Sequence, residues 1–214
     1  LLLSIPLYVS AEELQNTAAT TATEIVIDVN SASESWSFSI DALNPLLGTD
    51  KLVNNVSSAI VYEANSQTLM YAWNPDTQMY PASLVKILTA LIAVEQGNLT
   101  DLVTVSKGAV NSVPHDAVSA KLVAGEKLTL EELLFCMILG SANDAAAVIA
   151  EHISGSQNAF VSEMNRYAQE LGCTQSNFTN VHGLHDDNQK ITVRDCARIL
   201  DVALKTDLFK TIFT

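Results

Sequence analysis

Residues 80–97 most constrain what this chain can fold into. After Ser83 nearly every position up to Val94 is apolar, and a helix that is apolar on all faces is normally buried in a core. Pro81 and Ser83 suit the start of a helix, and Gly97 suits the left-handed position just past its end. The sequence therefore predicts a buried helix from Ser83 to Gly97.

A lysine lies in the first turn of this predicted core helix. Ser83 and Lys86 are three residues apart and share a face of the helix. A buried ammonium is costly unless it is paired, and a lysine whose pKa burial has lowered can take the proton of a serine hydroxyl. The alternative is a capping serine followed by a lysine that reaches to the surface, and the tetrad alone does not separate the two.

The composition excludes some classes of partner. Acidic residues number 24 against 11 basic ones, for a net charge of −13. Without a basic stripe to neutralise phosphates, a nucleic-acid partner is not expected, and neither is a polybasic membrane patch. Cys136, Cys173 and Cys196 do not form a disulfide framework, and each is expected to be a small buried apolar residue.

The first 56 residues differ in character from the rest. Residues 1–11 resemble the tail of a secretory signal peptide, because an apolar segment too short to span a bilayer ends in Val9-Ser10-Ala11. The alternative for this segment is a buried strand. Residues 12–56 are a leader of unclear structure, and residues 57–214 are predicted to be the folded domain.

Turn and capping signals organise this domain. Residues 58–62 and 68–73 predict a hairpin, residues 102–105 predict a short strand, and residues 111–120 are predicted to be a loop. Three helices are expected from their capping residues: one from Thr129 with Glu132 to Leu139, one from Ser156 to Leu171, and one from Thr192 with Asp195 to about Lys205.

Two polar segments interrupt this helical pattern. Ser141 and Asn143 lie between two apolar runs, where they either cap the next helix or present a hydroxyl and an amide to a pocket. His182 and His185, with two aspartates close by, could be metal ligands, but their spacing matches no helical H-x-x-x-H pattern. No metal site is therefore predicted.

Taken together, four segments resemble the low-molecular-weight D-alanyl-D-alanine carboxypeptidases, which are penicillin-binding proteins that trim peptidoglycan stem peptides. The resemblance covers roughly residues 57–205 and includes two of the three signatures of the penicillin-recognising serine enzymes, S-x-x-K and S-x-N. The segments are Pro81-Ala82-Ser83-Leu84-Val85-Lys86, Gly125-Glu126-Lys127-Leu128-Thr129, Ser141-Ala142-Asn143-Asp144 and Val181-His182-Gly183-Leu184-His185-Asp186.

The resemblance implies an α+β fold of the β-lactamase and penicillin-binding transpeptidase type, with a helical lobe beside an antiparallel sheet. It implies that Ser83 is the acyl-ester nucleophile, Lys86 the general base and Ser141 a proton relay, and that Asn143 holds Lys86 and the substrate amide. The expected partners are stem peptides ending in D-alanyl-D-alanine and β-lactam antibiotics. No cofactor or metal is expected, and the protein is expected to be exported to the outer face of the bacterial cell membrane.

One family signature is missing from the 214 residues. The third signature is a K-T-G strand, and Lys205-Thr206-Asp207 does not replace it, because aspartate cannot stand for a glycine that lets substrate backbone approach closely. The resemblance implies that the family chain continues past Thr214 with further strands and a membrane anchor. The catalytic domain is thus expected to be truncated here, and inactive by itself.

Three alternative functions are weaker. A class A-like β-lactamase typically has S-D-N and an E-x-x-L-N segment, whereas position 142 here is alanine and no E-x-x-L-N occurs. A non-catalytic cell-wall-binding paralogue would not need the intact Ser83, Lys86, Ser141 and Asn143. A zinc peptidase would depend on the two histidines alone.

Overall fold

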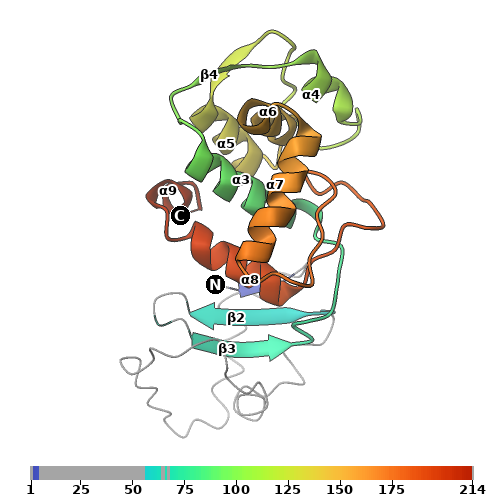
Figure 1. Ribbon diagram of the computed structural model, residues 1–214, viewed down its shortest axis with the longest axis vertical. Helices are drawn as coiled ribbons and strands as arrows, with labels where there is room; N and C mark the ends of the chain where they lie inside the picture. The colour runs from blue at the N-terminus through green and yellow to red at the C-terminus, as the bar shows by residue number, and fades with distance from the viewer. Residues whose placement is uncertain (1, 5–55, 64–65, 67, 214) are drawn as a thin grey trace, which may run out of the picture. The chain divides into compact units, whose positions relative to one another are not determined.

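The computed structural model describes residues 2–4, 56–63, 66 and 68–213 (Figure 1). The chain divides into two compact units, residues 1–77 and 78–214.

The first unit contains a three-stranded antiparallel sheet in the order β1-β2-β3. Its strands are β1 (Leu2–Ser4), β2 (Ala59–Glu63) and β3 (Thr68–Trp73). The β2–β3 hairpin confirms the prediction from alternating apolar residues, and its register shifts between Val61 and Tyr62. In β1, which covers three of residues 1–11, Leu3 lies opposite Ile60.

Most of the predictions for the N-terminal part concern residues outside the described ranges. Residues 5–55 lie outside the described part of the chain. The signal-peptide hypothesis for residues 1–11 and the leader at residues 12–56 therefore stay predictions.

The second unit is built around helix α3 (Val85–Gln96), which follows a 3₁₀ turn, η2 (Ala82–Leu84). Every residue from Val85 to Ala93 is buried, and α3 contacts each of α5, α6, α7, α8 and α9 (Figure 1). This confirms the predicted core helix. The other helices are α4 (Lys107–Ser112), α5 (Leu130–Leu139), α6 (Asn143–Ser154), α7 (Gln157–Glu170), α8 (Val193–Ala203) and α9 (Asp207–Phe213).

Local capping sets where these helices begin. Thr129 and Glu132 form the predicted capping box at α5, which also follows β5 (Lys127–Thr129), the partner of β4 (Leu102–Thr104). Ser156 and Thr192 cap α7 and α8 as predicted. The short sheets and the helical unit confirm the expected α+β class. None of the helices in the described part of the chain is long and apolar enough to cross a membrane.

Two local predictions are wrong. Helix α4 runs to Ser112, whereas a loop was predicted from Asn111, and the missed signal is Ser106, whose hydroxyl accepts the Ala109 N–H at 2.8 Å. Gly97 is also not left-handed, since its φ is −96° and its ψ is 159°. Glycine is needed there for space, because a Cβ would lie 2.3 Å from Leu130 Cδ2.

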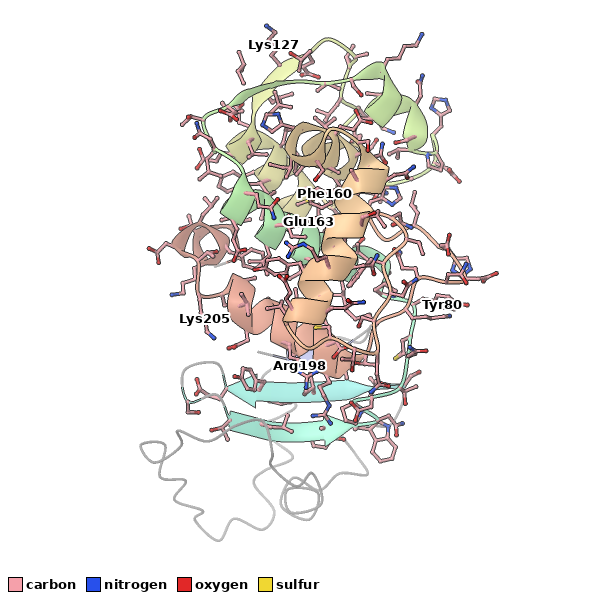
Figure 2. The ribbon with its side chains drawn as sticks, in the orientation of Figure 1. Tyr80, Lys127, Phe160, Glu163, Arg198 and Lys205 are labelled. Carbon is pink, nitrogen blue, oxygen red and sulfur yellow. The ribbon has the colours of Figure 1, made fainter. Side chains whose placement is uncertain are left out.

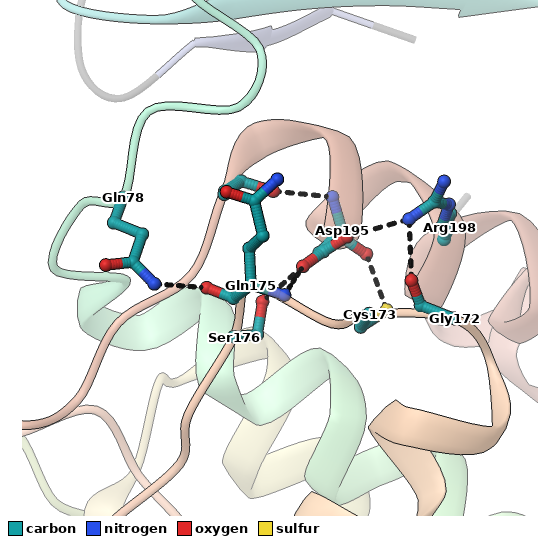
Figure 3. Close-up of polar contacts among 8 residues, drawn as sticks. Gln78, Gly172, Cys173, Gln175, Ser176, Asp195 and Arg198 are labelled. Atoms are coloured by element: carbon teal, nitrogen blue, oxygen red, sulfur yellow. Dashed lines mark hydrogen bonds and ion pairs between the residues drawn. The ribbon is translucent and has the colours of Figure 1, made fainter.

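A buried carboxylate joins the start of α8 to the loop that follows α7 (Figure 3). Asp195 accepts hydrogen bonds from the Ser176 hydroxyl at 2.8 Å and from the Gln175 N–H at 3.3 Å. Arg198 donates to Asp195 at 3.0 Å and to the Gly172 carbonyl at 2.8 Å. This cluster ties α7 and α8 together at the end of the unit.

Candidate active site

Ser83 lies in the single 3₁₀ turn that leads into α3. Pro81 begins this turn with φ −74°, and Ala82 has a positive φ of 47°. The N-cap of α3 is Leu84, which makes no side-chain capping bond. Ser83 is therefore not a capping serine, which removes the alternative that the tetrad had left open.

The Lys86 ammonium is buried among four oxygen atoms, none of them charged. Lys86 is 2% exposed, and Nζ lies 2.7 Å from both Asn143 Oδ1 and the His182 carbonyl oxygen. It lies 3.2 Å from Ser83 Oγ and 3.4 Å from Ser141 Oγ. Because burial disfavours the charged form, the pKa of Lys86 is lowered to about 8.

Ser141 and Asn143 come from the turn between α5 and α6. Ser141 has a φ of 52°, and the N-cap of α6 is Ala142, without a side-chain capping bond. The capping alternative for these residues is therefore wrong, and the expectation that both reach Lys86 is confirmed in geometry. Ser141 Oγ also donates to Ser83 Oγ at 2.9 Å, so the two hydroxyls and the amine form one cluster.

A further acceptor, which no motif in the sequence indicated, comes from the loop between α7 and α8. The His182 carbonyl bonds to Lys86 across 96 residues of sequence. Gly183 has a φ of 91°, and a Cβ there would lie 1.8 Å from the Ala82 carbonyl oxygen. The sequence signal was the glycine itself, since only glycine allows this loop so close to the backbone beside Ser83.

The two histidines of this loop have different environments. The His182 ring is buried, and its Nδ1 accepts the Leu184 N–H at 3.2 Å. Burial, and then the charge of Lys86, lower the pKa of His182 to about 4. His185 is exposed, with Nε2 3.3 Å from Asp187 and the ring edge-on to Tyr80. No group of three or more His, Cys, Asp or Glu in the described part of the chain could hold a metal ion.

The other candidates of the sequence analysis lie away from this cluster. Cys173 and Cys196 are buried, and burial raises the pKa of each thiol to about 12, which suits apolar packing and not nucleophilic attack. Cys136 is half-buried. Lys205 lies in the turn that follows α8 (Figure 2) and donates to Asp201 at 2.9 Å. Asp207 is the first residue of α9, so the K-T-D segment joins two helices and is not a strand.

The geometry gives the cluster a definite chemical capacity. A neutral Lys86 amine keeps two N–H groups, and the two shortest contacts, to Asn143 and His182, use both of them. Its one lone pair can then accept the hydroxyl proton of Ser83, whose Oγ lies 3.2 Å away, while the Ser141 hydroxyl donates to Ser83 Oγ. The cluster can therefore accept a proton from a serine hydroxyl, as a base does in nucleophilic catalysis.

Comparison with known proteins identifies the family of this chain. The family model described as D-alanyl-D-alanine carboxypeptidase matches residues 49–214. The chain belongs to this family. The carboxypeptidase DacA of Haemophilus influenzae is 35% identical over 167 residues, covering 76% of this chain and 42% of that protein. DacF of Bacillus subtilis is 32% identical over 162 residues, covering 73% of this chain and 41% of that protein.

Solved structures of the family have the same fold. Penicillin binding protein 5 from Haemophilus influenzae matches with a TM-score of 0.64 and 36% identity, over 69% of this chain and 44% of that one. A D-alanyl-D-alanine carboxypeptidase from Mycobacterium tuberculosis matches with a TM-score of 0.67 and 27% identity, over 72% and 58%. The chain spans about two-fifths of the length of the curated relatives DacA and DacF.

Proposed function

We propose that this chain carries the nucleophile and base of a serine-type D-alanyl-D-alanine carboxypeptidase. Its substrate is a peptidoglycan stem peptide that ends in D-alanyl-D-alanine. The observation that carries the proposal is the buried Lys86 amine, 3.2 Å from Ser83 Oγ, whose four hydrogen-bond partners in the described part of the chain are all neutral oxygens. Family membership supports the same reaction.

The proposed reaction has two halves. Ser83 Oγ attacks the carbonyl carbon between the two D-alanines while its proton passes to Lys86 Nζ, and the Ser83 N–H stabilises the oxyanion. The carbon–nitrogen bond then breaks, and Ser141 relays the proton from Lys86 to the leaving amine. Water next attacks the acyl ester and gives a proton to Lys86. The bond between the acyl carbon and Ser83 Oγ then breaks, Lys86 returns the proton to Ser83 Oγ, and the shortened peptide leaves with a new carboxyl group.

The same nucleophile is proposed to react with penicillin. Opening of the strained lactam ring by Ser83 would leave an acyl-enzyme of the same kind, and relatives named penicillin binding proteins support this. Because the substrate is a cell-wall peptide, we propose that the protein acts outside the cytoplasmic membrane after export by an N-terminal signal. Protein sequencing of the exported form would show whether residues 1–11 are removed.

The test uses the full-length protein that contains this chain. We expect fluorescent penicillin to label Ser83, and a peptide ending in D-alanyl-D-alanine to release D-alanine. Ser83→Ala should abolish both, because the Lys86 base would have no hydroxyl at the attacking position. If the folded Ser83→Ala protein still releases D-alanine at the wild-type rate, the nucleophile lies elsewhere and the proposal fails.

A further inference from the structure

The loop between α7 and α8 supplies one of the two short contacts to Lys86, yet residues 179–184 have no regular secondary structure. In the described part of the chain, the isolated β-bridges of this loop are at its ends, where Asn177 pairs with Lys190 and Met79 pairs with Ile191. Something other than a strand ladder must therefore fix the direction of the His182 carbonyl.

A buried amide side chain satisfies much of this loop. Gln189 is 1% exposed, and its Oε1 accepts the N–H groups of Thr179 at 3.1 Å and Asn180 at 3.0 Å. Its Nε2 donates to the Leu184 carbonyl and to Asn180 Oδ1, both at 3.3 Å. Gln189 thus bonds to the backbone on both sides of His182.

Asn180 continues the contacts of Gln189 to the residues next to the carbonyl. Its Oδ1 accepts the N–H groups of Gly183 at 2.7 Å and His182 at 3.3 Å, and its Nδ2 donates to the Leu184 carbonyl at 2.8 Å. The peptide unit whose oxygen accepts from Lys86 is the one whose nitrogen belongs to Gly183. Asn180 therefore holds one end of that unit, while Lys86 bonds to the other.

We propose that Gln189, acting through Asn180, is a positioning residue that aims the His182 carbonyl at Lys86 and so directs the lysine lone pair at Ser83. The inference rests on the proposed function, since it assigns Lys86 the role of base. Without Gln189 the loop loses its hydrogen bonds to Thr179 and Asn180 before His182 and to the Leu184 carbonyl after it, and the His182 carbonyl is no longer held against Nζ. One N–H of the neutral Lys86 amine then has no acceptor to orient it, and the amine can rotate so that its lone pair points away from the Ser83 hydroxyl.

The experiment compares Gln189→Met with a matched control, Asn165→Leu, in the full-length protein. Methionine keeps the approximate size of glutamine and removes its hydrogen bonds. Asn165 on α7 also bonds to this loop through its side-chain amide, but at Phe178, before Asn180. Its Oδ1 accepts the Phe178 N–H at 2.9 Å, and its Nδ2 donates to the Phe178 carbonyl at 2.8 Å. Both variants should lower the unfolding temperature, because both remove side-chain bonds to loop backbone.

Only the Gln189 variant should change the chemistry. We expect Gln189→Met to slow acylation by fluorescent penicillin roughly 10- to 100-fold on its pH plateau, as small misplacements of a reacting group do. Losing the His182 carbonyl as an acceptor disfavours the charged form of Lys86 and lowers its pKa. The acid limb of the pH–rate profile, where acylation slows because Lys86 is protonated, should therefore lie at lower pH than in the wild type. Asn165→Leu should keep the wild-type plateau and limb.

Other outcomes overturn the inference. It fails if folded Gln189→Met acylates like wild type, or if Asn165→Leu slows acylation and shifts the limb equally. Where Gln189→Met does not fold, Gln189→Glu takes its place, because a carboxylate keeps the accepted bonds and loses the donated ones, and a wild-type plateau and limb would again overturn the inference. If neither variant folds, Gln189 determines the fold and is not a positioning residue. A wild-type protein that neither labels nor releases D-alanine would instead refute the proposed function.

Discussion

Lys86 on α3 and Asp195 on α8 are both charged and 2% exposed, yet their partners differ in kind. Asp195 has a guanidinium at 3.0 Å and two further donors, so its charge is compensated. Lys86 has four oxygens, all of them neutral. A buried charge with a counter-charge joins parts of a fold, whereas one without a counter-charge is kept at a cost in stability.

This difference separates structural burial from functional burial. The Lys86 amine can lose its proton near neutral pH because no carboxylate is among the partners that hold it, and its lowered pKa of about 8 follows from burial. A carboxylate beside it would favour the ammonium and remove the base. The ability of Lys86 to act as a base therefore depends on its being held by neutral acceptors such as Asn143 Oδ1 and the His182 carbonyl.

The largest expected effect comes from removing the uncompensated charge. Lys86→Met in the full-length protein should slow acylation by fluorescent penicillin about 10²- to 10⁴-fold, the usual loss on removing a general base. Urea unfolding should show no loss of stability, because the variant also removes a buried ammonium. Lys107 on α4 is exposed, and Lys107→Met serves as the control with wild-type labelling. If Lys86→Met is labelled at the wild-type rate, Lys86 is not the base and its burial has no catalytic role.

The opposite result is expected for the compensated charge. Asp195→Ala removes the acceptor of the Ser176 hydroxyl and of the Gln175 N–H and the carboxylate that faces Arg198, and should lower the free energy of unfolding by about 2–4 kcal/mol. Asp195→Asn, which keeps an acceptor oxygen, should lose less. Urea titration measures both. The folded Asp195→Ala protein should keep its acylation rate, and a loss as large as that of Lys86→Met would contradict the contrast.

The smallest effect concerns pH. Only the neutral amine accepts a proton, so acylation should slow as the pH falls below the Lys86 pKa of about 8. Between pH 9 and pH 7 the neutral fraction of such a group falls about tenfold, and the rate constant should fall in proportion. Stopped-flow labelling with fluorescent penicillin across this range measures the pH dependence of the rate constant. The Asp195→Asn variant should show the same pH dependence as the wild type. A rate independent of pH would mean that Lys86 is not the base.

Much of the fold could be predicted from the sequence because its signals are local. The capping box of Thr129 and Glu132 and the caps at Ser156 and Thr192 act within one turn of helix, and each appears where it was predicted. The apolar run after Ser83 likewise predicts a buried helix whatever packs against it. Where a cap was overlooked, at Ser106, helix α4 was missed.

The roles of other residues depend on contacts with residues far away in the sequence, which local sequence patterns do not indicate. Gly97 was taken for a left-handed cap, but its backbone is extended and the glycine makes room for Leu130. Ser141 and Asn143 could have been caps, and only the packing of α6 against α3 shows that they reach Lys86.

The sequence by itself determined that Ser83 and Lys86 lie on one side of the start of a core helix, because three residues make nearly one turn. The structure places Ser83 in the 3₁₀ turn η2 and Lys86 in α3. It also determined, through its motifs, the family to which the chain belongs. Only the tertiary structure decided what surrounds the lysine. Asn143 and the His182 carbonyl are 57 and 96 residues away, and contacts across such separations are set by how helices and loops pack, not by the order of neighbouring residues.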